Sequence, residues 1–520
     1  MKDSYQSPLS GIYSYQYDRD RRLISTIFPS GKQISNVYDT SQLIQTQTPE
    51  GNIDYTYSCA LKLDSVSKNG KSINYTYDGN LVKSIASTGT LNQGIELDYN
   101  NDFNTTSIKY AGVTEYITYD NDGLITGVGN YTITNNAQNG LPESVTGGSL
   151  QVDMTFNGYA EVENQTVTIG GQAASSWNLT RDDNGRILSK TENLNGTVEN
   201  FVYGYDSMGR LHTVSKDGTL VEEYIYNATG TRQYEMNTPK GIAGRTMVYS
   251  DEDHLLSAAN TNYNYDVDGF LTTKTQGSDI SLYNYSSRGE LLSVTLPNGT
   301  FIEYSHDPLG RRIAKKVNGQ VTEKYLWNGL TQLLAVYDGA DNLFQRFEYA
   351  DDRMPVSMSQ NGIHYYFAFD QVGSLRLVTD SAGNVTKRID RDTFGYVISD
   401  SNPNFAVPFG FAGGLYDADT GLVRFGYRDY DPDTGRWTAK DPIGFSGGDT
   451  DLYGYVLNDP VNFVDPEGLI GLEIFPKIWK FLNRVDDASD AKKIAEEIKK
   501  GAESEHPNPE DGYKVIEEVV

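Results

Sequence analysis

A short alternating pattern recurs along most of the chain. The segment "YGYDSMGRLHTVSKDGTLVEEYIYNATGTRQ" holds two copies, in which Tyr205 and Tyr226, and likewise Gly209 and Gly230, stand 21 positions apart. In Tyr-x-Tyr and in "RLHTVS" the pattern has a period of two, which places every second side chain on the same face of a β-strand. Each unit is therefore predicted to form two strands.

Turn residues separate these predicted strands. Asp-x-x-Gly is typical of a β-turn, in which the Asp side chain caps the turn and Gly accommodates a positive φ. Later copies place Gly269, Gly289 and Gly310 at steps of 20 and 21 residues. A single hairpin cannot bury its own face, so the copies should stack into one continuous sheet. A β-propeller, whose repeats run to roughly forty residues, fits less well because the period here is half as long.

Composition supports an all-β fold and narrows the possible functions. The 520 residues include 38 Tyr and 51 Gly, which suits half-buried strands joined by frequent turns. The net charge of −27 argues against nucleic-acid binding by the bulk of the chain, because like charges repel. Cys59 is the only cysteine, which excludes an internal disulfide. The start of the chain lacks the apolar part of a signal peptide, and no stretch reaches the roughly eighteen apolar residues of a membrane-spanning helix.

The last third of the chain carries a specific series of motifs. The segment "PFGFAGGLYDADTGLVRFGYRDYDPDTGRWTAKDPIGFSGGDTDLYGYVLNDPVNFVDPEGL" follows "HYYFAFDQVGSLRLVTDSAGNV". Together with the repeats, these motifs resemble the Rhs, or YD-repeat, family over residues 5–469. The resemblance implies a spiralling β-hairpin sheet that forms a hollow shell around a variable C-terminal toxin. It also implies three parts: a YD-repeat shell (1–360), an Rhs-associated core that curls inward and holds a self-cleavage motif (361–469), and a cargo segment (470–520).

Two carboxylates occupy matching turns, Asp441 in "KDPIG" and Asp465 in "VDPEG". Paired carboxyl groups can perform acid–base chemistry, because one keeps its proton while the other activates water. The same Asp-Pro-x-Gly text is also a good type I turn, so a purely structural role remains open. The family resemblance implies that these two aspartates form an aspartyl-protease-like pair, which cuts the bond between Leu469 and Ile470 once.

The resemblance also assigns a functional arginine, which falls on Arg428 in "GYRDYDPDTGRW". An arginine near a carboxylate pair would lower the pKa of one carboxyl and separate the two roles. This chain departs from the family at the next position, where Asp429 replaces the usual aromatic residue. We therefore expect altered packing around that position.

The C-terminal tail differs from the rest in composition. "FPKIWKFLNRV" places Ile478, Phe481 and Leu482 at helical spacing, and "SDAKKIAEEIKKG" is typical of a second helix. His506 has no evident catalytic partner, so we interpret the tail as a helical, non-enzymatic cargo that apolar contacts, including those of Ile474, hold inside the shell. No cofactor is expected, and the five histidines lack the spacing of a metal site.

Two classes of function remain. The first is a bacterial toxin-delivery protein that cages its C-terminal segment and releases it by self-cleavage. A dedicated secretion machine would export such a protein without a signal peptide, and an immunity protein would be a further partner. The second is a non-enzymatic adhesion protein of the cell surface or wall, whose Asp turns are only structural.

Overall fold

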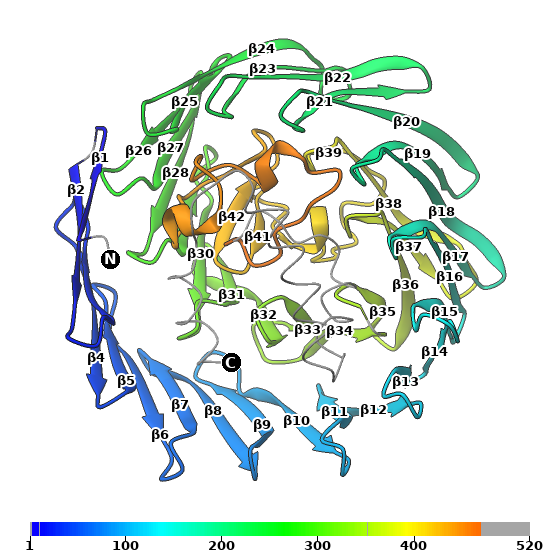
Figure 1. The fold of residues 1–520 in the computed structure, drawn as a ribbon, viewed down its shortest axis with the longest axis horizontal. Coiled ribbons are helices and arrows are strands. Elements are labelled where there is room, and N and C mark those ends of the chain that lie inside the picture. Colours follow the sequence, from blue (N-terminus) through cyan, green and yellow to red (C-terminus); the bar gives the residue numbers. More distant parts are fainter. Residues whose placement is uncertain (1–2, 10, 351, 470–520) are drawn as a thin grey trace.

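The computed structural model describes residues 3–9, 11–350 and 352–469. In this part of the chain, 39 strands form one long antiparallel sheet. Successive strands pair in chain order, from β1 with β2 to β38 with β39, and the sheet winds in a spiral (Figure 1). The first turn comprises β1 (Ser4–Ser7), β2 (Gly11–Tyr17), β3 (Leu23–Ile27), β4 (Gln33–Asp39), β5 (Gln42–Gln47), β6 (Ile53–Tyr57), β7 (Leu63–Lys68), β8 (Lys71–Asp78), β9 (Leu81–Thr88), β10 (Gln93–Tyr99), β11 (Thr105–Tyr110), β12 (Val113–Tyr119), β13 (Ile125–Val128), β14 (Tyr131–Asn135), β15 (Pro142–Gly147), β16 (Leu150–Phe156), β17 (Val162–Ile169), β18 (Gln172–Arg181), β19 (Ile187–Leu194), β20 (Thr197–Tyr205), β21 (Leu211–Lys216), β22 (Thr219–Tyr226), β23 (Arg232–Asn237), the short 3₁₀ helix η1 (Thr238–Lys240), β24 (Ile242–Tyr249), β25 (Leu255–Ala258) and β26 (Thr261–Tyr265).

The second turn of the spiral lies inside the first, and residues 401–469 fill its centre (Figure 1). We call this central segment the plug. The inner turn comprises β27 (Leu271–Gln276), β28 (Asp279–Tyr285), β29 (Leu291–Thr295), β30 (Phe301–His306), β31 (Arg312–Val317), β32 (Gln320–Asn328), β33 (Gln332–Tyr337), β34 (Leu343–Tyr349), β35 (Pro355–Gln360), β36 (Ile363–Phe369), β37 (Leu375–Asp380), β38 (Val385–Arg391) and β39 (Val397–Asp400). The plug comprises η2 (Phe411–Gly413), β40 (Leu415–Tyr416), β41 (Val423–Phe425), β42 (Arg428–Asp431), β43 (Arg436–Trp437), η3 (Gly444–Gly447) and η4 (Val456–Asn458).

Hydrogen bonds explain why the repeat contains the Asp-x-x-Gly-Arg motif. In the turn after β20, Asp206 Oδ1 accepts hydrogen bonds from the N–H groups of Met208 (2.9 Å) and Arg210 (3.0 Å). Gly209 has a φ of 82°, which favours glycine. The Nε of Arg210 donates to Asp206 Oδ2 at 2.7 Å. The arginine thus stabilises the carboxylate that caps its own turn.

In several repeats the tyrosine before the Asp or Asn of the turn bonds one hairpin to the preceding one. The hydroxyl of Tyr226 donates to the carbonyl oxygen of Leu211 at 2.8 Å, and Tyr205 makes the same bond to Ile187 at 2.7 Å. The guanidinium of Arg210 lies 4.8 Å from the centre of the Tyr226 ring, within the range of a cation–π contact. The Tyr-Asp-x-x-Gly-Arg-Leu motif therefore stabilises both a turn and the contact between neighbouring hairpins.

The opposite ends of many strands are joined by two-residue turns. Asp217 and Gly218 have φ values of 49° and 80°, and Asn195 and Gly196 have 49° and 86°. Two successive positive φ values are the signature of a type I′ turn, whose twist matches that of the flanking strands. A glycine with positive φ therefore occurs in the turns at both ends of these strands.

Hydrogen bonds between the two turns of the spiral show how it narrows. The sequence separation between the partners falls along the chain, from 255 residues for Tyr13 with Asp268, through 237 for Tyr110 with Phe347, to 155 for Asn237 with Asp392. The number of residues in one full turn of the spiral therefore decreases as the sheet winds inward. Apolar side chains fill the space between the layers: the largest cluster joins Leu91 and Ile95 of the first turn to Phe347 and Phe367 of the inner turn and Phe409 of the plug.

The predicted all-β, spiralling shell is confirmed, and the described sheet is not closed on itself. The predicted tail helices, Ile470, and the expected cargo contacts of Ile474, Ile478, Phe481 and Leu482 lie outside the described residues.

Candidate active site

Aromatic rings fix the geometry of the plug. Phe425, Tyr430, Trp437 and Tyr455 are almost completely buried, and their ring centres lie 4.7 to 6.2 Å apart. Tyr430 of this cluster belongs to β42, the strand that begins at Arg428, and Phe425 and Trp437 belong to the neighbouring strands β41 and β43. A strand packed on one face by rigid rings holds its polar residues in a defined position.

Arg428 joins both predicted aspartates. Its Nη2 lies 2.9 Å from Asp441 Oδ2 and 3.2 Å from Asp465 Oδ2, its Nε donates to the carbonyl oxygen of Gly468, and its guanidinium lies 4.3 Å from the Trp437 ring centre. The arginine is only 4% exposed. Three residues that the family resemblance singled out are therefore in direct contact.

The turn that contains Asp465 holds the end of the described chain. Asp465 Oδ1 accepts hydrogen bonds from the N–H groups of Gly468 (2.9 Å) and Leu469 (3.1 Å). Gly468 has a φ of 71°, and a Cβ there would lie 2.8 Å from the carbonyl oxygen of Phe425. Glycine is thus required both by the backbone conformation and by the close approach of the neighbouring segment.

The Asp441 carboxylate and the Leu469 carbonyl oxygen both lie close to Gly447. A Cβ atom built on Gly447 would stand 2.7 Å from Leu469 O and 2.9 Å from Asp441 Oδ2, so these two oxygens are no farther apart than the sum of those distances. Burial raises the pKa of Asp441 to about 6, although Arg428 and the N–H of Ile443 lower it and Asp465 raises it further. Asp441 is therefore a carboxyl group that carries a proton in mildly acidic solution.

Asp429, which replaces the aromatic residue usual in the family, is buried, and two arginines balance its negative charge. Its carboxylate is 1% exposed and pairs with Arg312 Nη2 at 2.7 Å and Arg424 Nη1 at 2.8 Å. A buried carboxylate is tolerated when such partners surround it. The altered packing expected there is therefore an ion-pair cluster between β31, β41 and β42.

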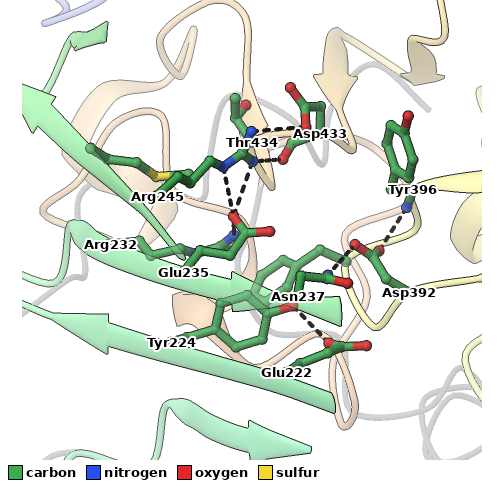
Figure 2. A network of polar contacts seen from close by, with 12 residues as sticks. Glu222, Tyr224, Arg232, Glu235, Asn237, Arg245, Asp392, Tyr396, Asp433 and Thr434 are labelled. Atoms are coloured by element: carbon green, nitrogen blue, oxygen red, sulfur yellow. Dashed lines mark hydrogen bonds and ion pairs between the residues drawn. The ribbon is translucent and has the colours of Figure 1, made fainter. Parts of the chain in front are cut away.

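A second polar network, which the repeat pattern did not indicate, joins the plug to the shell wall (Figure 2). Asp433 Oδ1 lies 3.0 Å from Arg245 Nη1 and 3.3 Å from Lys240 Nζ. Glu235 lies 3.0 Å from Arg245 and 3.1 Å from Lys240. These residues come from β23, η1, β24 and the Asp-Pro turn before β43, so the network links elements about 190 residues apart. The sequence showed the acidic turn "DPDTG" but did not indicate which residues pair with it.

The network continues to Glu222 and Asp392. Asp392 Oδ2 accepts a hydrogen bond from Asn237 at 2.9 Å, and Glu222 accepts one from the Tyr224 hydroxyl at 2.6 Å. Burial, followed by the nearby charge of Asp392, raises the pKa of Glu222 to about 7. We call the set Glu222, Glu235, Lys240, Arg245, Asp392 and Asp433 the latch.

In the described part of the chain, no three His, Cys, Asp or Glu side chains gather in a way that could hold a metal ion. No helix among the same residues is long and apolar enough to span a membrane.

Comparisons with known proteins place this geometry in context. The family model described as Teneurin YD-shell matches residues 2–461. The chain is 27% identical over 464 residues to Teneurin-1 of Gallus gallus, an alignment that covers 84% of this chain and 17% of that protein. It is 28% identical over 341 residues to Double-stranded DNA deaminase toxin A of Burkholderia cenocepacia (strain H111), covering 58% of this chain and 23% of that toxin. The chain thus spans less than a quarter of either relative.

A similar fold occurs among solved structures. The crystal structure of TcdB2-TccC3-TEV superposes with a TM-score of 0.71 at 17% identity, over 90% of this chain and 28% of that one. At this identity the likeness concerns the fold.

Proposed function

Because this chain belongs to the Teneurin YD-shell family, within the broader Rhs and YD-repeat group, we propose that it is a shell that encloses a toxic C-terminal segment and releases it by cutting itself once, after Leu469. In this proposal residues 1–360 form the shell wall, residues 361–469 form the core that closes it and cuts, and residues 470–520 are the cargo.

One observation carries the cleavage proposal: a single guanidinium contacts two buried carboxylates beside the peptide to be cut. Arg428 Nη2 contacts Asp441 and Asp465, and Arg428 Nε binds the carbonyl of Gly468, one residue before the bond. Aspartyl-protease chemistry requires two adjacent carboxyl groups, one that donates a proton and one that accepts a proton. The arginine fixes their positions and that of the substrate peptide together.

The two aspartates take different roles. Asp441, whose pKa is raised to about 6, acts as the acid beside the carbonyl oxygen of Leu469, and Asp465 acts as the base. A water oxygen attacks the carbonyl carbon of Leu469 while one water proton passes to Asp465, and Asp441 gives its proton to the carbonyl oxygen. The resulting diol collapses: the bond to the nitrogen of residue 470 breaks, Asp465 returns its proton to that nitrogen, and Asp441 recovers a proton from a hydroxyl. Atoms and protons balance, and both carboxyl groups return to their starting states.

The relatives support a toxic cargo. One of them is named a toxin, and the chain aligns with it over 58% of its own length. A shell of this kind would be secreted from a bacterium by a dedicated apparatus, and the producer would need an immunity protein against the cargo. The proposed partners of the shell are therefore its own C-terminal segment, the secretion apparatus and the immunity protein.

Denaturing electrophoresis of the purified chain tests the cleavage. The wild type should give a large fragment ending at Leu469 and a small fragment beginning at residue 470, as verified by mass spectrometry. Asp441→Asn or Asp465→Asn should each leave the chain intact. Asp459→Asn is the matched control, because Asp459 also precedes a proline and is buried in the plug. A wild type that stays intact, or cleavage that persists in both variants, would refute the proposal.

A non-enzymatic adhesion protein is the second candidate. It is favoured by the fact that both aspartates also cap turns: Asp441 Oδ1 accepts from the N–H of Ile443 at 2.9 Å, and Asp465 Oδ1 accepts from Gly468 and Leu469. In that case an intact wild type would be recovered, and the two substitutions would change only stability.

A further inference from the structure

A small cavity lies where the plug meets the inner turn of the spiral. On the wall side it is lined by Arg311, Arg312 and part of β32 and β33, and on the plug side by the segment around η2, by Arg424 and by Pro466. Arg353 also lines it. Four lining residues are thus arginines, whereas none of the described residues that line the cavity is acidic.

The arginines around this cavity outnumber the carboxylates that bind them. Arg312 and Arg424 share the single carboxylate of Asp429, and Arg311 pairs with Asp307 at 2.6 Å. Three buried cations therefore share two anions. Because a buried charge without a counter-charge is costly, this arrangement favours a further negative charge in the cavity.

The next nearest acids are engaged elsewhere. Glu290 faces Arg288 at 3.6 Å, and Asp417 pairs with Lys315 at 2.8 Å. Both acids also attract cavity arginines, Asp417 attracting Arg312 and Glu290 attracting Arg424, but neither acid lines the cavity. The positive charge of the lining is therefore not met by an acidic side chain within the lining itself.

Two N–H groups of the arginines that line the cavity also lack an acceptor. The Nε atoms of Arg312 and Arg424 find no hydrogen-bond acceptor among the described residues, although the side chains are only 3% and 4% exposed. A buried donor without an acceptor costs about 1–3 kcal/mol and is rare in folded proteins. An acceptor in the cavity would remove this cost, and a charged acceptor would do so most effectively.

We propose that the cavity binds one small monovalent anion of about the size of chloride. The space open to the centres of water-sized atoms is about 20 Å³, which is enough for one small ion. The anion bridges Arg312 of the wall and Arg424 of the plug. It thereby ties the plug to the shell wall next to Pro466, independently of whether the chain cuts itself.

Bromide provides a direct test, because it is close to chloride in size and scatters anomalously. Crystals of the full chain grown without halide are soaked in sodium bromide. We expect one anomalous peak in contact with Arg312 and Arg424. A cavity that holds water without an anomalous peak would overturn the proposal.

Thermal melting in solution provides the second test. We expect a saturable rise in melting temperature with sodium chloride that sodium gluconate, whose anion is too large for the cavity, does not give at equal ionic strength. Arg424→Gln should remove this saturable rise, whereas Arg19→Gln on the distant first turn should retain it. If Arg424→Gln does not fold, Arg312→Gln takes its place. A bromide peak without any saturable rise would mean binding at crystal concentration only and would overturn the proposal.

Discussion

Replacing Glu222 by glutamine should make the protein more stable at neutral pH while leaving its stability in acid unchanged. Glu222 is 4% exposed and accepts hydrogen bonds from the Tyr224 hydroxyl at 2.6 Å and from the N–H of Thr393 at 3.3 Å. A glutamine has nearly the shape of the carboxyl group and can keep both contacts in changed form: its Oε1 accepts from the N–H of Thr393, and its Nε2 donates to the Tyr224 hydroxyl, which can also accept. The substitution therefore removes the charge with little change in packing.

The magnitude and sign follow from the shifted pKa. Burial raises the pKa of Glu222 from 4.5 to about 7 in the folded protein, so the folded state keeps the proton in a range where the unfolded chain has lost it. The stabilising contribution of the protonated group is complete below pH 4.5 and is lost as the pH rises toward 7. A difference of about 2.5 pKa units corresponds to about 3 kcal/mol above pH 7. Glutamine does not titrate and avoids this loss.

Urea unfolding of the wild type and of Glu222→Gln at pH 4.5 and pH 8 measures the effect. We expect equal free energies of unfolding at pH 4.5 and a more stable variant at pH 8, by up to about 3 kcal/mol. Glu223→Gln, which changes the adjacent residue on the opposite face of β22, is the matched control and should show no such pH dependence. If Glu222→Gln destabilises the protein equally at both pH values, Glu222 is an ionised partner in the latch and the reasoning is refuted.

Four further predictions concern the cut, the latch and the repeat. Arg428→Gln should prevent self-cleavage because the two carboxylates lose their common partner, and an intact band on a denaturing gel would show this. The rate of self-cleavage should fall as the pH rises above about 6, because Asp441 then loses the proton that it donates; a rate that rises over this range in timed gel samples would contradict its role as the acid. Asp433→Asn should lower the free energy of unfolding by about 3 kcal/mol, because it leaves two buried cations underpaired; an unchanged urea midpoint would show that the latch does not stabilise the plug. Tyr226→Phe should cost about 1 kcal/mol through loss of the bond to Leu211, whereas Tyr116→Phe, at a ring that is 68% exposed, should leave the same urea midpoint unchanged.

The residues of the candidate site could be named from the sequence, but their arrangement could not. Asp441, Asp465 and Arg428 were identified from motifs that resemble a known family, and each motif is a local turn or strand. That one guanidinium contacts both carboxylates and the Gly468 carbonyl depends on how β42 packs against the aromatic cluster of the plug. The cleavage itself stays a prediction, because geometry alone does not show that the bond breaks.

What the sequence determined is the hairpin and its period. The contacts of the repeat join residues within about one unit, as when Tyr226 binds Leu211 and Asp206 binds Arg210. Both partners of such a contact lie within about twenty consecutive residues. The strands, the turns and the all-β class could therefore be predicted from the sequence. Asp429 and the latch show the opposite case, because Asp429 also pairs with Arg312 and Asp433 pairs with Arg245, each more than a hundred residues away.

Only the tertiary structure decided which hairpins lie against each other. The separation between partners in adjacent turns falls from 255 to 155 residues, a change that no single repeat encodes. It arises because the curvature of the spiral is the sum of small twists over 39 strands, and a slight difference in each shifts the pairing of layers by a whole hairpin. The latch, the ion pairs of Asp429 and the arginine-lined cavity all form where such layers meet, and their partners are therefore fixed by accumulated geometry rather than by any local pattern.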